Sequence, residues 1–257
     1  MVNSKIEWTD DTANLWHGCT KVNEGCRNCY AANLSRRYGR NIWGTSKPRL
    51  KIMSFENELN KYQRLATEDG NIRRVFVGSM MDIFEESKPL IDNHSKTLEV
   101  TSGDLRQKFF QNITDGMYSN LDFLFLTKRP GNINRFIPEL WKTNPQENVM
   151  FGTSVVNQST ANNLIAQLIK VNGRRFLSVE PQLDRLTLLP WLHAKLIDWV
   201  IVGGESGPGR RPFNTDWARH LRNECKVTGT AFFFKQVDKV QPIPCDLLVR
   251  EFYKSHT

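Results

Sequence analysis

Six short apolar runs recur along this 257-residue chain, with starts 23 to 46 residues apart. They are rich in β-branched and aromatic residues: 75-VFVG-78, 121-LDFLFLT-127, 148-NVMFGTS-154, 175-RFLSVE-180, 198-DWVIVGGE-205 and 230-TAFFFKQ-236. The runs are continuous rather than alternating, as in parallel strands that are buried on both faces. The intervals leave room for a helix between each pair of runs. Repeated strand–helix units predict an α/β fold whose parallel sheet is open or closes into a partial or full (β/α) barrel.

Helical patterns fill four of these intervals, at 103–118, 132–142, 159–171 and 215–229. Several begin after a Ser, Thr, Asn or Asp cap, and the last ends at Gly229. A weak first strand is predicted near 13–18, while the polar segments 40–72 and 85–102 are interpreted as irregular insertions. Since no internal repeat, low-complexity tract or linker is visible, we expect one domain over residues 1–257.

Polar residues follow every apolar run, and in parallel (β/α) folds the carboxyl ends of the strands form the active site. Strands also end wherever the chain meets water, so one such residue means little. Six successive polar ends predict a polar pocket instead. In chain order, these residues are Ser79, Asp82, Thr127, Lys128, Thr153, Ser154, Glu180, Gly203, Gly204, Glu205, Lys235 and Gln236.

Three of the five cysteines lie within the loop 17–31, as Cys19, Cys26 and Cys29 with the spacing C-x6-C-x2-C. A closed zinc site takes four ligands, and His17, Cys225 or Cys245 could supply the fourth. An iron–sulfur cluster on three thiolates would instead leave one iron open, which in radical chemistry binds S-adenosylmethionine. Ordinary structural cysteines are the third interpretation. Gly18 and Gly25 would let the loop wrap closely around a bound group.

The chain has a net charge of +8 and a pI near 9.3, which favours an anionic partner such as nucleic acid. No sequence motif typical of RNA or DNA binding is visible. The sequence shows neither a long apolar run nor a charged-then-apolar leader, so a cytoplasmic protein is expected. The clustered cysteines and the two isolated ones agree with a reduced compartment better than with a disulfide framework.

Several longer motifs carry a resemblance to a known family. They are 5-KIEWTDDTANLWHGCTKVNEGCRNCYA-31, 79-SMMDIF-84, 126-LTKRP-130, 152-GTSVVNQ-158, 178-SVEP-181, 199-WVIVGGESGPGRRP-212, 232-FFFKQ-236 and 246-DLLVREF-252. Together they resemble the three-Cys-motif family of phage and bacterial proteins, which is similar to the radical SAM superfamily and distantly to spore photoproduct lyase, an enzyme that acts on a DNA lesion. The usual radical SAM spacing is C-x3-C-x2-C, from which this chain departs.

The resemblance implies a partial (β/α) barrel with a [4Fe-4S] cluster on Cys19, Cys26 and Cys29 and S-adenosylmethionine beside it. Family members often occur with a separate partner protein, so such a partner is also implied. The expected function is a radical SAM enzyme. It would take one electron from an external donor, cleave S-adenosylmethionine and remove a hydrogen atom from a nucleic acid, a nucleotide or another substrate. The alternative is a non-catalytic, zinc-stabilised protein that binds nucleic acid.

Candidate residues follow from the strand ends and the cysteine loop. For the cofactor they are Tyr30, Ser79, Asp82, Thr153, Ser154, Glu180, Gly203, Gly204 and Glu205, with the hydroxyls of Thr153 and Ser154 suited to a ribose. In radical SAM barrels a Gly-Gly-Glu follows the second strand, whereas 203-GGE-205 ends the fifth run here. Candidates for a phosphate-bearing substrate are Lys128, Arg129, Arg210, Arg211 and Lys235.

Overall fold

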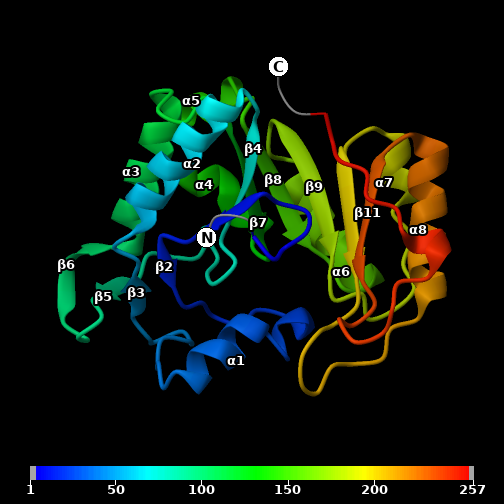
Figure 1. Ribbon diagram of the computed structural model, residues 1–257, viewed down its shortest axis with the longest axis horizontal. Coiled ribbons are helices and arrows are strands. Elements are labelled where there is room, and N and C mark those ends of the chain that lie inside the picture. The colour runs from blue at the N-terminus through cyan, green and yellow to red at the C-terminus, as the bar shows by residue number, and fades with distance from the viewer. Residues whose placement is uncertain (1–3, 255–257) are drawn as a thin grey trace.

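A sheet of seven parallel strands forms the centre of the computed structural model, which describes residues 4–254 (Figure 1). The strands are β1 (Asp11–Ala13), β4 (Arg73–Val77), β7 (Leu121–Thr127), β8 (Val149–Ser154), β9 (Arg174–Val179), β10 (Trp199–Gly203) and β11 (Ala231–Gln236). Their order in the sheet is their order in the chain, and every neighbouring pair is parallel. The sheet curls into a half barrel, which confirms the predicted parallel α/β architecture.

Helices follow the strands and cover the outer, convex face of the sheet (Figure 1). They are α2 (Phe55–Asp69), α3 (Ser102–Thr114), α4 (Ile133–Phe136), α5 (Glu139–Thr143), α6 (Gln158–Leu168), α7 (Leu189–His193) and α8 (Thr215–Thr228). One further helix, α1 (Tyr30–Arg37), follows the cysteine loop and lies below the sheet in Figure 1. Within residues 4–254, three short 3-10 helices occur, at Glu24–Cys26, Pro130–Asn132 and Cys245–Leu247.

The two faces of the sheet bury separate apolar cores. On the outer face, side chains such as Val75, Phe123 and Phe151 belong to the large core that includes the helices. On the inner, concave face a smaller aromatic core holds Trp8, Phe76, Leu124, Met150, Phe176, Trp199, Ile201, Phe233 and Tyr253. Because side chains alternate between faces along a strand, Ser154, Ser178 and Lys235 share the inner face with this core, nearer the carboxyl ends.

A second, four-stranded sheet lies beside the first and was not predicted. Its order is β2 (Trp16–His17), β3 (Arg49–Lys51), β5 (Pro89–Ile91) and β6 (Thr97–Thr101). The segments 40–72 and 85–102, interpreted from sequence as irregular, therefore contain α2, β3, β5 and β6. In α2 the buried residues Phe55, Leu59, Tyr62 and Ala66 recur every three to four positions, a helical pattern that the polar composition concealed.

Most other element predictions are confirmed. The structure begins α3 at a Thr101–Asp104 capping box and ends α8 at Gly229, which adopts a left-handed φ of 66°. The predicted helix 132–142 is divided into α4 and α5, because Ile137 precedes Pro138 and is extended. The predicted strand 13–18 is likewise divided, between β1 of the large sheet and β2 of the small one.

None of the helices in residues 4–254 is both long enough and apolar enough to cross a membrane.

Candidate cofactor site

The cysteine loop, predicted at 17–31, lies across the carboxyl ends of the large sheet, with His17 in β2 and Tyr30 and Ala31 in α1. It contacts the segments that follow four strands. After β4, Met80 O accepts a hydrogen bond from Gly18 N at 3.0 Å, and after β7, Arg129 Nη2 donates to Thr20 O at 2.6 Å. After β8, Val156 faces Gly25, and after β10, Glu205 Oε2 accepts from Asn28 Nδ2 at 2.9 Å. The loop therefore covers the edge of the sheet where parallel (β/α) proteins form their active sites.

Two glycines allow this close packing of the loop. Gly18 has a φ of 113°, and a Cβ there would lie 2.4 Å from the carbonyl oxygen of Ile42. A Cβ at Gly25 would lie 2.7 Å from Val156 Cγ1. Between them, Asn23 Oδ1 accepts a hydrogen bond from Gly25 N at 3.0 Å and so caps the short helix Glu24–Cys26. The loop is thus a fixed structure in which Cys26 ends a helical turn.

All three cysteines are free and half-buried. Burial, with the negative charges of Asp82 and Glu85, raises the pKa of Cys19 to about 12, while Arg129 acts in the opposite direction. Cys26 Sγ lies 3.8 Å from Asn23 Oδ1, and Cys29 is the N-cap residue of α1. None of the three thiols is paired in a disulfide, and all three lie between β2 and the start of α1.

No three His, Cys, Asp or Glu side chains within residues 4–254 form a group that could hold one metal ion. A zinc site needs its ligands about 2.0–2.3 Å from one ion, whereas a cube of four irons holds its thiolates further apart. His17, a candidate fourth zinc ligand, lies in β2. Burial and the positive charge of Arg40 lower its pKa to about 4, so its imidazole is neutral.

Asp82 and Arg129 form a largely buried ion pair next to Cys19. Arg129 Nη1 donates to Asp82 Oδ2 at 2.7 Å and lies 3.8 Å from Cys19 Sγ. Asp82 also accepts hydrogen bonds from Thr127 Oγ1 at 2.8 Å and from the backbone N–H groups of Phe84 and Lys128. Neither charged group is free to meet a ligand, so the two candidates Asp82 and Arg129 position the loop in this structure.

A second buried ion pair supports the same region and was missed from the sequence. Arg49 is fully buried and donates to both oxygens of Glu85, at 2.9 and 2.7 Å. It also donates to Thr20 Oγ1 at 2.9 Å, next to Cys19. No local signal identified Arg49, because Glu85 is 36 residues away in the chain.

At the opposite side of the loop, Glu205 holds it to the segment after β10. This buried carboxylate accepts from Asn28 Nδ2, from Arg211 N at 2.9 Å and from Arg211 Nη2 at 2.6 Å. Burial raises the pKa of Glu205, but the hydrogen bonds from Arg211 and Asn28 outweigh it and leave the pKa below its ordinary value. Arg210 donates to Asp238 Oδ2 at 2.8 Å. All three predicted substrate arginines, Arg129, Arg210 and Arg211, are thus paired within the protein.

The inner face of the sheet carries three of the predicted groups, Ser154, Glu180 and Lys235, together with Ser178. Lys235 Nζ donates to Glu180 Oε1 at 2.6 Å. Ser154 is buried beside Ser178 on the neighbouring strand β9, and neither hydroxyl is bonded to another described residue. Ser178 was not predicted, although 178-SVEP-181 includes it. The two serine hydroxyls and the Glu180–Lys235 ion pair lie on the inner face, nearer the carboxyl ends of the strands than the aromatic core.

The remaining candidates have structural contacts. Tyr30, whose ring is half-exposed, donates its hydroxyl to Ser79 O at 2.6 Å, and Ser79 Oγ accepts from Asn14 Nδ2. Thr153 is turned to the other face of the sheet from Ser154 and donates to Thr127 O at 2.9 Å. A Cβ at Gly204 would lie 2.0 Å from Val237 O, whereas one at Gly203 would meet only ordinary contacts. Gly204 is required by packing.

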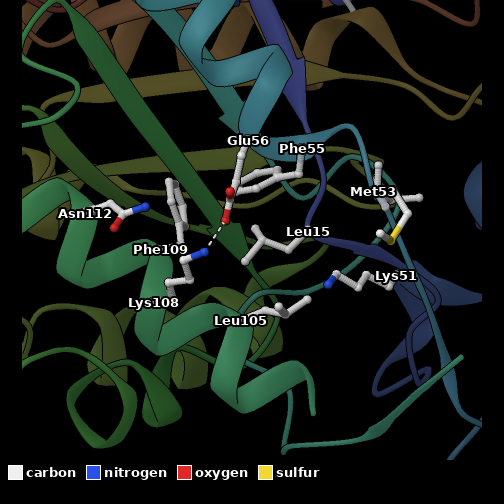
Figure 2. A pocket seen from close by; sticks show the side chains of 10 residues that line it. Leu15, Lys51, Met53, Phe55, Glu56, Leu105, Lys108, Phe109 and Asn112 are labelled. Carbon is white, nitrogen blue, oxygen red and sulfur yellow. Dashed lines mark hydrogen bonds and ion pairs between the residues drawn. The ribbon is translucent and has the colours of Figure 1, made fainter. Parts of the chain in front are cut away.

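Two hollows lie away from this loop. A pocket of about 240 Å³ opens between α2 and α3, with Leu15, Phe55 and Phe109 in its lining and the Lys108–Glu56 ion pair across it (Figure 2). A groove of about 900 Å³ lies at the amino-terminal ends of β9 to β11. Neither lining includes a predicted cofactor or substrate residue.

The fold and the site define a class of α/β protein in which a parallel half barrel carries a three-cysteine loop across its carboxyl-end edge. The chain belongs to the family described as "Protein of unknown function (DUF5131)", whose model matches residues 3–243. No curated protein and no solved structure matches the chain.

Proposed function

We propose that the protein is a radical SAM enzyme that holds a [4Fe-4S] cluster on Cys19, Cys26 and Cys29 and binds S-adenosylmethionine beside it. One observation carries this proposal: a closely packed, hydrogen-bonded loop with three free, half-buried thiols crosses the carboxyl ends of a parallel half barrel. Three thiolates leave one iron of such a cluster open. The barrel type, the cofactors and the cytoplasmic location belong to the same proposal.

The surroundings of the loop fit a bound cluster. Metal ligation requires thiolates, and the high pKa of Cys19 means that its proton must leave as iron binds. Arg129 and its partner Asp82 are held in place before that happens, so the guanidinium would face the new negative charge on Cys19. On the other side, Glu205 and Arg211 hold Asn28 next to Cys29.

When bound, the cluster and S-adenosylmethionine would supply one-electron reduction of a sulfonium and a carbon radical that removes a hydrogen atom from substrate. The chain's own residues would orient the cofactor and exclude water. The free hydroxyls of Ser154 and Ser178 can each accept and donate hydrogen bonds to a ribose. The Glu180–Lys235 pair would have to open for its two charges to meet the zwitterionic amino-acid part, and the aromatic core would close the barrel beneath.

Iron and sulfide analysis of anaerobically reconstituted protein tests the proposal. We expect about four irons and four sulfides per chain, and an electron paramagnetic resonance signal of the reduced protein that shifts when S-adenosylmethionine is added. One zinc per chain without a cluster signal would contradict the proposal. That result would favour the non-catalytic zinc protein, although no three potential ligands converge within the described residues.

A further inference from the structure

The positive charge of the chain is concentrated in one segment. Residues 12–55 contain eight Lys or Arg and one Glu, which gives +7, while the whole chain carries +8. The basic residues are Lys21, Arg27, Arg36, Arg37, Arg40, Lys47, Arg49 and Lys51. The other 213 residues therefore contribute only +1. This segment includes the cysteine loop, α1 and the chain that leads to β3.

Most of these cations point into solvent without an acidic partner. Arg27, Arg36, Arg37 and Arg40 are exposed, and none of them forms a salt bridge with a residue in the range 4–254. Arg49 is the exception, since it is buried against Glu85. Arg36 and Arg37 lie in the last turn of α1, where positive charges interact favourably with the helix dipole. Arg27 and Arg40 lie outside that helix, so the helix dipole does not explain all four exposed arginines.

Exposed aromatic rings accompany these cations. Tyr38, the residue after α1, is 68% exposed, and Tyr30 at its start is 51% exposed. Tyr side chains are enriched at binding interfaces, because each has a large apolar ring and a polar hydroxyl. Arginines around exposed rings are the arrangement that binds single-stranded nucleic acid, because cations neutralise phosphates and rings stack on unpaired bases.

The basic surface lies directly beside the proposed cofactor site. Helix α1 begins immediately after Cys29 and packs its buried face, Ala31, Ala32 and Ser35, against the protein. At 1.5 Å per residue, Arg36 and Arg37 are about 10–12 Å along the helix from Cys29. Figure 1 shows α1 beneath the sheet and next to the segment after β10, and Asn28 Nδ2 joins the two by donating to Gly209 O at 2.9 Å.

The cations predicted from the sequence to bind phosphate are less suitable. Arg129 is paired with Asp82, Arg211 with Glu205, Arg210 with Asp238 and Lys235 with Glu180. A phosphate would have to compete with each of these carboxylates. Lys128 has no such partner among the described residues and lies against Gly25 of the loop, so it can extend the basic surface toward the cysteines.

We propose that Arg27, Arg36, Arg37, Arg40 and Tyr38, the α1 surface, bind the backbone and bases of single-stranded nucleic acid and present it to the cysteine loop. This inference rests on the proposed function, because that function supplies the reaction at the cysteine loop. The inference adds the class of substrate, single-stranded nucleic acid. An enzyme that acts on a base needs the base out of a duplex. The α1 surface would hold an unpaired strand for that purpose.

The test is the binding of a fluorescent single-stranded oligonucleotide, DNA or RNA, to the full chain at several salt concentrations. Each phosphate contact contributes a slope of about 0.7 in log K against log salt. Replacing both cations in Arg36→Ala/Arg37→Ala should therefore lower the slope by about 1.4 and weaken binding about 25-fold at 0.1 M salt. Tyr38→Ala should weaken it on the order of 10-fold with little change of slope.

The matched control is Lys61→Ala/Arg64→Ala, which removes the same charge from exposed positions of α2 on the outer face. It should leave the slope unchanged. Equal losses in the two double variants, or no loss in either, would overturn the proposal. So would tighter binding to a duplex of the same sequence, or binding to anionic vesicles but not to the oligonucleotide.

The binding assay needs no cofactor. Its failure would therefore leave the iron and sulfide result standing, and absence of a cluster would leave nucleic-acid binding standing. The two proposals can fail separately.

Discussion

Arg129 Nη1 lies 3.8 Å from Cys19 Sγ, which connects the residue two positions after β7 to the first cysteine of the loop. The same guanidinium donates to Thr20 O and to Asp82. One side chain thus fixes both the position and the electrostatic surroundings of Cys19.

Replacement of Arg129 by Met should destabilise the protein by about 2–4 kcal/mol, because it leaves the buried carboxylate of Asp82 without its cation. Urea unfolding measures this change. The control is Arg135→Met, whose partner Glu86 is exposed, and it should cost less than about 1 kcal/mol. Equal costs for the two variants would show that the Arg129–Asp82 pair does not stabilise the loop.

Replacement of Cys19, Cys26 or Cys29 by Ala should each lower the iron and sulfide content of reconstituted protein to a small fraction of wild type, since two thiolates hold a cluster poorly. The exposed Cys245 is the matched control, and Cys245→Ala should retain the full content. Iron retained in any one of the three loop variants would remove that cysteine from the ligand set.

Ala at Gly204 should destabilise the protein by about 1–3 kcal/mol or more, because its Cβ would lie 2.0 Å from Val237 O and 2.8 Å from the Phe213 side chain. The adjacent Gly203→Ala is the control, since its nearest contact would be 3.4 Å from Gln236 O. Thermal or urea unfolding compares them. A small cost at both positions would mean that the segment after β10 relaxes easily.

Glu205→Gln should lower stability at pH 7 by about 1–3 kcal/mol, because the charged hydrogen bonds to Arg211 and Asn28 are weakened. The pKa of Glu205 is lowered in the folded protein, so this stabilisation is present above the unfolded pKa, near 4.5, and is lost as the pH falls through the folded pKa. Wild type and variant should therefore converge at acid pH. A difference that stays constant from pH 7 to pH 3 would contradict the assignment.

Much of the large sheet could be predicted because its strands are locally distinctive. The run 121-LDFLFLT-127 coincides with β7, since a strand buried on both faces is apolar along most of its length, and its one charged residue, Asp122, is paired with Arg174. The small sheet could not be predicted, because strands of two to five residues such as β2 and β3 carry too few side chains to show a pattern. Their pairing depends on contacts between segments far apart in the chain.

The candidate site was predicted by residue type rather than by pairing. The sequence identified Asp82 and Glu205 as groups at strand ends and Arg129 and Arg211 as candidates for phosphate binding, and the structure brings all four to the carboxyl-end edge of the sheet. The sequence could not show that Asp82 pairs with Arg129 and Glu205 with Arg211, because these contacts depend on how the sheet curves. The exposed arginines of α1 were visible as residues, but only the fold separates a free cation from a paired one.

The inner aromatic core also sets an order of events during synthesis. Trp8 and Tyr253 both pack on Trp199, with ring centroids 6.2 and 5.1 Å away, and they are 245 residues apart in the chain. At about 5–20 residues per second, the ribosome needs roughly 10–50 s to add the second after the first. The aromatic core of the concave face can therefore be completed only when translation is almost over. The cysteine loop is synthesised early, but the complete half barrel that would hold a cluster exists only after release of the nascent chain.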